Sequence, residues 1–187
     1  ADRADIATAA EQIKAKTTWI AGVVHNAGIL SPIKPMAEVD RADWARNIQI
    51  NLVGVKDLTN RLIPVMGGKQ QSRVTTISSG ASLNPVSGWS AYCVAKAGLD
   101  MWSKCLAQEG ADSNISSISV APGIVDTDMQ KTIRSSNEND FPNHKTFVEL
   151  HNDGQLVQPK LVAGKLGPLI TDHSMEQSGM RFDVREL

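Results

Sequence analysis

The sequence has almost no net charge, few cysteines and no long apolar run. Its 187 residues hold 19 basic and 20 acidic side chains, a formal net charge of -1, which offers no positive field for nucleic acid. No apolar stretch approaches the roughly 20 residues of a transmembrane helix. We therefore expect a globular protein with a small-molecule partner, and we expect neither nucleic acid nor a membrane to be bound.

The two cysteines and four histidines also show no pattern of a site. Cys93 and Cys105 would lie on one helix about three turns apart, roughly 18 Å at ~1.5 Å per residue, which is too far for a disulfide. The histidines share no metal-ligand spacing, and no CxxC or HExxH motif occurs. These patterns, and the lack of a signal-peptide pattern after Ala1, predict reduced thiols, no metal and a cytoplasmic protein.

What the sequence does have is an alternation of helical and strand patterns. With 41% hydrophobic residues the chain can bury a core, and we expect one domain over residues 1–187. The periodicity predicts helices at 5–16, 44–62, 90–111 and 159–171, and strands at 18–24, 73–77, 115–120 and 180–184. Asp40 and Ser90 are expected to cap two of these helices, and the polar stretch 127–158 is expected to be a mobile flap. The order predicts an α/β fold, a parallel sheet with helices on both faces, whose ligand lies beyond the carboxyl ends of the strands.

Tyr92, the only tyrosine, precedes Lys96 by four residues, so on a helix the phenol and the ammonium share a face. A nearby cation favours the phenolate and lowers the pKa of a tyrosine from about 10 toward neutrality. The pair is therefore typical of proton transfer. The alternative is a buried tyrosine beside a lysine whose stem lies along the apolar surface.

Five pieces of sequence occur in a fixed order: Asn26-Ala27-Gly28, Asn51-Leu52-Val53-Gly54, Ser79 thirteen residues before Tyr92, the segment from Tyr92 to Lys96, and Pro122-Gly123-Ile124-Val125-Asp126-Thr127. Together they resemble the motifs of the short-chain dehydrogenase/reductase superfamily. The region 121–134 is also similar to fungal members near the benzil and sepiapterin reductases. The resemblance implies a Rossmann-like, doubly wound sheet and reduction of a carbonyl by a nicotinamide cofactor.

The resemblance implies a role for each matching residue. Tyr92 would protonate the substrate oxygen, Lys96 would lower the pKa of Tyr92 and bind the nicotinamide ribose, and Ser79 would hold the carbonyl oxygen. Asn51 would lie where a helix is distorted and hold a water that links Lys96 to solvent.

The resemblance also implies a cofactor site for NADP, with NAD as the alternative. Its residues would be Tyr92 and Lys96 at the ribose, Asn26, Ala27 and Gly28 at the adenosine side, Pro122, Gly123, Val125 and Thr127 at the nicotinamide, and Asp2 near the adenine. His25 replaces the first asparagine of the family's usual Asn-Asn-Ala-Gly.

Simpler interpretations exist for several of these residues. Ser79 could cap a turn and Asn51 could be an ordinary polar residue on a helix. Asp126 and Asp128 flank Thr127 at a predicted helix start, where acidic residues complement the dipole, and we expect both to cap that helix. For His25 we expect a local hydrogen bond, and Trp89 could belong to the core or line the substrate pocket.

A Gly-rich turn that binds the cofactor pyrophosphate opens the sequence of these relatives but does not occur here. The sequence resembles the last three quarters of such an enzyme, without the first strands of the sheet, so we expect an uncovered edge at 18–24. Two explanations follow: a piece of a longer reductase, or a short, non-catalytic form that acts as a binding partner or remnant fold. Relatives pair through the helices at 43–65 and 90–111, so the resemblance implies a homodimer or homotetramer.

Overall fold

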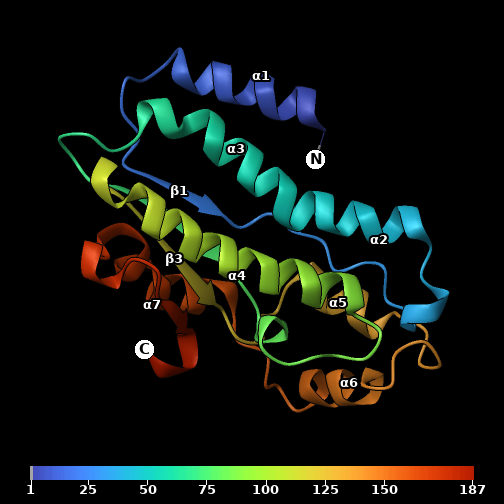
Figure 1. Ribbon diagram of the computed structural model, residues 1–187. Coiled ribbons are helices and arrows are strands. Elements are labelled where there is room, and N and C mark those ends of the chain that lie inside the picture. Colours follow the sequence, from blue (N-terminus) through green and yellow to red (C-terminus); the bar gives the residue numbers. More distant parts are fainter. Residues whose placement is uncertain (1) are drawn as a thin grey trace.

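The computed structural model describes residues 2–187 and shows a parallel sheet of four strands (Figure 1). The strands are β1 (Gly22–His25), β2 (Ser72–Ile77), β3 (Ile115–Ala121) and β4 (Arg181–Asp183), and their order in the sheet is the order in the chain. All three neighbouring pairs are parallel. The predicted α/β fold is confirmed.

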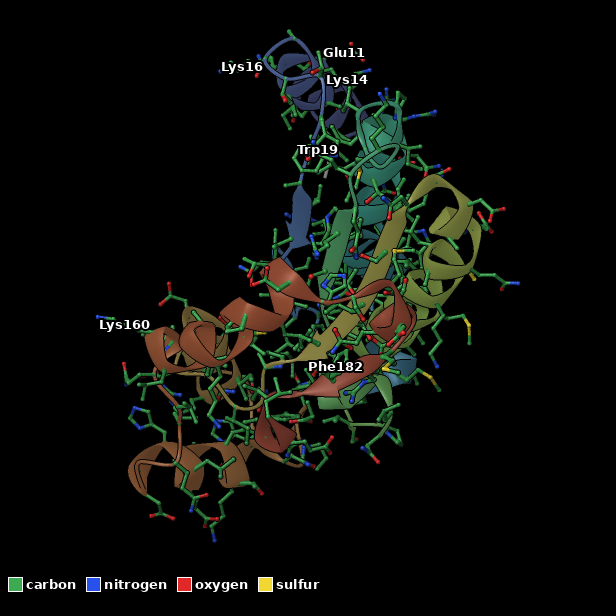
Figure 2. All side chains as sticks on the ribbon, turned by 90° about the vertical axis from the view of Figure 1, so that its left-hand side faces the viewer. Glu11, Lys14, Lys16, Trp19, Lys160 and Phe182 are labelled. Atoms are coloured by element: carbon green, nitrogen blue, oxygen red, sulfur yellow. The ribbon has the colours of Figure 1, made fainter. Side chains whose placement is uncertain are left out.

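Helices cover both faces of this sheet. α1 (Arg3–Lys14), α2 (Arg41–Ile48), α3 (Gly54–Leu62) and α4 (Ser90–Gly110) lie on one face. α7 (Pro159–Asp172), which carries Lys160, lies on the other, as the edge-on view in Figure 2 shows. Two shorter helices, α5 (Asp128–Arg134) and α6 (His144–Asn152), lie beyond the carboxyl ends of the strands (Figure 1). No helix within residues 2–187 is long and apolar enough to cross a membrane.

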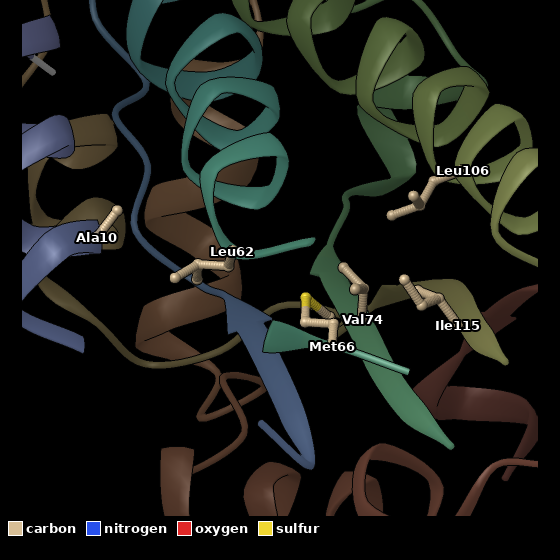
Figure 3. Close-up of a cluster of buried hydrophobic side chains, with 6 residues drawn as sticks. All are labelled: Ala10, Leu62, Met66, Val74, Leu106 and Ile115. Carbon is tan, nitrogen blue, oxygen red and sulfur yellow. The ribbon is translucent and has the colours of Figure 1, made fainter. Parts of the chain in front are cut away.

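Alternating side chains of the strands build a separate core on each face. Ile115 and Val74 point to the first face and pack with Ala10 of α1, Leu62 of α3 and Leu106 of α4 (Figure 3). On the second face β3 contributes Ile118 and Val120, which pack on Val162 and Leu166 of α7. A strand buried on both sides needs an almost continuous apolar or small-residue run, and β3 has one.

The first strand is shorter and more exposed than the pattern predicts. β1 begins at Gly22, and Val24 is 47% exposed. Within residues 2–187, β2 is the only strand that pairs with β1. The expected uncovered edge is therefore present.

The polar stretch 127–158 contains α5 and α6, and its Phe141 is completely buried. Apolar residues such as Ile133 pack in the same cluster; the predicted mobility of this stretch is not tested. The predicted capping role of Ser90 is wrong. Ser90 is the first residue of α4 and not its cap; Trp89 holds the cap position without a side-chain hydrogen bond. The capping role of Asp40 is confirmed by its hydrogen bonds from Ala42 and Asp43.

Candidate active site

Parallel strands bring three short segments to one edge of the sheet. Residues 26–28 follow β1, 78–80 follow β2 and 122–127 follow β3. The first turns of α4 add Tyr92 and Lys96, which are only 6% and 5% exposed. The structure thus places the residues that the motifs predict around one edge.

The pKa of Tyr92 is higher than the sequence predicts. Burial raises the pKa of its phenol, hydrogen bonding with the Ser79 side chain lowers it in part, and the nearby Cys93 raises it further. The expected lowering by Lys96 is therefore overturned, because withdrawing a phenolate from water outweighs the other influences here. The Lys96 ammonium lies 5.6 Å from the centre of the tyrosine ring.

Lys96 connects the helix to the strand that ends next to Ser79. Its Nζ donates a hydrogen bond of 2.6 Å to the carbonyl oxygen of Ile77, the last residue of β2. Burial lowers the pKa of Lys96 to about 8, and the Asp100 carboxylate opposes that change. The lysine is therefore charged at neutral pH but close to the range in which it releases its proton.

Ser79 is held by hydrogen bonds on both of its oxygens. Its Oγ accepts from the backbone N–H of Ala81 at 3.2 Å, so it does cap the turn, as the simpler interpretation holds. Its carbonyl oxygen accepts from Ser82 Oγ at 2.8 Å and from Arg181 Nη2 at 3.1 Å. Capping and the polar contact with Tyr92 coexist at one hydroxyl.

Asn51 lies in a local distortion, as predicted. Residues Gln49–Val53 form a π-helical turn between α2 and α3, a feature that is frequent at functional sites. The Asn51 side chain accepts from Ile29 N at 2.9 Å and donates to Ile29 O and to Asn47 Oδ1, both at 2.7 Å. The side chain thus holds the segment after residues 26–28 in place; the predicted water is not tested.

Position 28 requires glycine because a neighbouring side chain leaves no room for a Cβ. A Cβ at this position would lie 2.8 Å from Asn51 Oδ1 and 3.8 Å from Lys96 Nζ. Any side chain would therefore displace the asparagine that anchors Ile29. The sequence led us to expect close approach of a cofactor; the contact that the structure shows is with Asn51.

The residues expected at the nicotinamide follow β3. Gly123 has a φ of +74°, and a Cβ there would lie 3.3 Å from Val184 Cγ1, so two reasons favour glycine. The Thr127 hydroxyl donates to the carbonyl oxygen of Val125 at 3.4 Å, a long bond that leaves it free to turn. Pro122 precedes this turn and is partly exposed.

Asp2 lies apart from the other site residues, at the start of α1. Its carboxylate accepts from the backbone N–H groups of Ala4 and Asp5 at 2.6 and 3.4 Å. Because α1 runs opposite to β1, this end of the helix is on the carboxyl side of the sheet (Figure 1). Asp2 caps the helix, and nothing in the structure tests its contact with an adenine.

Sequence reasoning missed three residues. Asn47 is fully buried and donates to the carbonyl oxygens of residues 29–31, the shortest bond being 2.8 Å to Ser31. Asp100 and Arg181 form an ion pair of 3.1 Å between α4 and β4. The spacing of Asn47 and Asp100, four residues from Asn51 and Lys96, was the available signal; Arg181 had none, since its partners are distant in sequence.

The remaining polar residues have structural roles. His25 Nε2 lies 2.7 Å from Thr59 Oγ1 of α3, so the histidine forms a hydrogen bond as expected, but with a residue that is distant in sequence and not local. Burial lowers the pKa of His25 to about 4. Thr127 holds the cap position of α5 without a side-chain hydrogen bond, so the predicted capping by Asp126 and Asp128 is wrong. Asp128 lies in the first turn and pairs with Lys131 at 2.7 Å, and Asp126 accepts from Gln158 at 3.4 Å. No group of potential metal ligands occurs in residues 2–187.

Trp89 belongs to a buried aromatic cluster next to Tyr92. Its ring stacks on Phe141 at 5.2 Å between centroids and meets the edge of Tyr92 at 5.9 Å. Phe147 completes the group from α6. Of the two expectations for Trp89, the core is the correct one. Cys93 packs against the same cluster, and it and Cys105 are free thiols, as predicted.

Comparison with known proteins gives a consistent answer. A family model described as short chain dehydrogenase matches residues 1–138. A benzil reductase ((S)-benzoin forming) of Bacillus subtilis is 36% identical over 169 residues, which cover 88% of this chain and 68% of the relative. The Bacillus cereus enzyme is 35% identical over 158 residues, 83% of this chain and 64% of the relative.

Solved structures agree with these relatives. The KRED1-Pglu enzyme has a TM-score of 0.87 and 34% identity, covering 96% of this chain and 75% of the other. A short chain dehydrogenase/reductase from Saccharomyces cerevisiae has a TM-score of 0.86 and 28% identity, covering 98% and 73%. The chain thus spans about two thirds of the length of the curated relatives it matches. With a family model over most of its residues and relatives of this identity, the chain belongs to the short chain dehydrogenase family of oxidoreductases, near the benzil reductases.

Proposed function

We propose that this chain carries the catalytic residues of an NAD(P)H-dependent carbonyl reductase, which converts a ketone or aldehyde to an alcohol. The observation that supports this most strongly is the group of the partly buried Ser79 and the buried Tyr92 and Lys96 at the carboxyl edge of the sheet. We further propose that residues 1–187 belong to one domain of a cytoplasmic protein, in keeping with its two free cysteines.

In this proposal Tyr92 is the proton donor. Its raised pKa keeps the phenol protonated at neutral pH, as a group that must give a proton to a developing alkoxide requires. Ser79 donates a hydrogen bond to the same oxygen, where charge accumulates in the transition state. Lys96 places a positive charge beside the phenol and favours the phenolate that remains after transfer.

The residues present fit the nicotinamide half of a cofactor. Lys96 would bind the ribose, and the turn at Pro122 and Gly123, where a left-handed glycine exposes the backbone, would face the nicotinamide with Val125 and Thr127. When bound, the reduced nicotinamide supplies the hydride. Asn26, Ala27 and Gly28 would line the adenosine side and Asp2 would reach the adenine. We propose NADP as the cofactor and NAD as the alternative.

The substrate proposal follows from the relatives. Two of them are benzil reductases, and benzil is a diketone with two aromatic rings. Phe141 and Phe147 of the segment 127–158 pack on Trp89 and thereby hold this segment next to Tyr92. Benzil is therefore the first substrate to test.

A homodimer or homotetramer is the proposed assembly. The outer face of α4 exposes Val94 and Met101 at 51% and 59%. Exposed apolar residues on one helix face are typical of a contact surface. The competing function, a non-catalytic partner or remnant fold, uses the same surface but needs neither cofactor nor Tyr92.

Titration with NADPH and NADH, followed by fluorescence, tests the proposal. Saturable binding of NADPH and reduction of benzil by the bound cofactor are the expected results. If neither nucleotide binds saturably to this chain, the reductase proposal fails for it and the non-catalytic alternative stands.

A further inference from the structure

An ion pair next to the site joins three elements. Arg181, from β4, places its Nε 3.1 Å from Asp100 Oδ2 on α4 and donates from Nη2 to the carbonyl oxygen of Ser79, also at 3.1 Å. One guanidinium therefore joins β4, the helix that carries Tyr92, and Ser79 in the turn that follows β2. Both side chains of the pair are largely buried, 17% and 10% exposed, so solvent screens it little.

The same helix face carries Tyr92, Lys96 and Asp100 at intervals of four residues. Lys96 binds the carbonyl oxygen of Ile77, and Arg181 binds that of Ser79. Two cations from different elements thus hold the backbone on both sides of Ser78. These contacts fix the backbone of Ser79, and the hydrogen bond that its Oγ accepts from the backbone N–H of Ala81 orients the hydroxyl.

One of the two carboxylate oxygens of Asp100 has no partner among the described residues. Its Oδ2 pairs with Arg181, while its Oδ1 is buried and has no hydrogen-bond partner in residues 2–187. The charged or titratable groups around Lys96 are Tyr92 and Asp100 on its own helix and Arg181 behind Asp100; the π-helical turn brings the neutral Asn51. Asp100 acts against the loss of the Lys96 proton that burial promotes.

We propose that Arg181 and Asp100 are positioning residues for the reduction, Arg181 by fixing Ser79 against α4 and Asp100 by keeping Lys96 charged. The proposal rests on the proposed function, since Ser79 and Lys96 matter only if the chain is a reductase. Neither residue touches the reacting atoms in it. Each acts through a neighbour, and the two roles separate experimentally.

Arg181→Lys tests the first role, because a lysine keeps the charge but cannot reach Asp100 and Ser79 together in the geometry of a guanidinium. We expect kcat to fall about tenfold or more, as small misplacements of reacting groups do, with little change in KM. Arg73→Lys is the matched control: Arg73 also uses two arms, to His173 O and Gln71, but at the other end of the sheet. A kcat for Arg181→Lys within twofold of that control overturns the role of Arg181.

Asp100→Asn tests the second role without any turnover. NMR of ¹³C-labelled lysine side chains, with the Lys96 signal assigned by its loss in Lys96→Met, follows the titration in the absence of cofactor. The pKa of Lys96 should fall below the value of about 8 expected for the unmodified chain, and it should not fall in Arg181→Lys. An unchanged titration in Asp100→Asn overturns the role of Asp100.

The double variant Asp100→Asn/Arg181→Gln covers the case in which a single variant leaves a buried charge and unfolds. It removes both charges, and we expect it to fold, to lower kcat and to lower the pKa of Lys96. If the double variant keeps both at the unmodified values, the proposal is wrong. If the unmodified chain has no turnover, the proposed function is contradicted. The titration of Lys96 still tests whether Asp100 keeps Lys96 charged, because it needs no turnover.

Discussion

The helix α4 departs from an ordinary amphipathic helix because each of its two faces mixes polar and apolar residues. The inner face buries Tyr92, Lys96, Asp100 and Ser103, whereas the outer face exposes Val94, Met101 and Cys105. Buried polar groups cost free energy unless they find partners. Three of the four have one at close range: Lys96 in Ile77, Asp100 in Arg181, and Ser103 in Ser117 at 2.8 Å.

The comparison shows which property of a residue points to function. The inner face also buries Leu99 and Leu106, so apolar packing holds this face toward the sheet. Its polar residues find their hydrogen-bonding partners on strands β2, β3 and β4, and the partners of Lys96 and Asp100 lie next to the site. Buried polar residues on this face therefore point to chemistry, and exposed apolar residues on the outer face point to a surface that another molecule covers.

Among the variants that test the difference between the two faces of α4, Tyr92→Phe should have the largest effect, a loss of turnover. Removing the proton donor at the top of the inner face should reduce turnover by about 10²–10⁴-fold, the usual contribution of a positioned acid. Affinity for NADPH, measured by fluorescence, should stay nearly the same because the ring remains. Val94→Ala, on the outer face two residues away, is the control and should keep turnover within about twofold. Retained turnover in Tyr92→Phe would remove this residue from the mechanism.

Leu99 and Met101 compare the two faces by stability. Leu99 is 1% exposed, and Leu99→Ala should lower the free energy of unfolding by about 2–5 kcal/mol through lost contacts and a cavity. Met101 is 59% exposed, and Met101→Ala should change that free energy by no more than about 0.5 kcal/mol in the monomer. Denaturant unfolding at low protein concentration measures both. Equal losses would mean that the helix is rotated from the orientation described.

Lys96 makes the inner face sensitive to pH. Burial lowers its pKa from 10.5 to about 8, so between these pH values the unfolded chain binds more protons than the folded one, and stability rises with pH. At about 1.4 kcal/mol for each pH unit this amounts to roughly 3 kcal/mol between pH 8 and 10.5. In Lys96→Met this rise should be absent, which chemical denaturation across that range measures. A parallel pH dependence of the two chains would contradict the low pKa.

Contacts between residues that are close in sequence can be predicted from the sequence of this chain, and contacts between distant residues cannot. The Tyr92 and Lys96 pair is local, and the π-helical turn at Asn51 follows from its motif, so both are predicted. The bounds of β1 and the exposure of Val24 are not predicted, because both depend on which strands lie beside β1. The buried Phe141 was hidden in a polar stretch, where a single aromatic anchor contributes little to the average composition.

Long-range ion pairs are the least predictable part. Arg181 and Asp100 are 81 residues apart, and neither lies in a recognisable motif. Only the parallel order of β3 and β4 brings the arginine to α4. The same reason explains the wrong expectation for the pKa of Tyr92: the sequence shows the nearby cation but not the degree of burial, which is the larger influence.

The smallest effect on the folded monomer is expected from the outer face. Replacing Val94 and Met101 together by serine removes exposed apolar surface, so the free energy of unfolding of the monomer should change by less than about 0.5 kcal/mol. The assembly should respond, because burial of such side chains contributes about 25 cal/mol for each Å² withdrawn from water. By light scattering the unmodified chain should have the mass of a dimer or tetramer and the double variant that of a monomer. Leu161→Ser, which changes an equally exposed residue of α7 on the other face of the sheet, should leave the mass unaltered. A monomeric unmodified chain at tens of micromolar would show that the apolar outer face of α4 does not drive association, and the contrast between its two faces would then reflect the site alone.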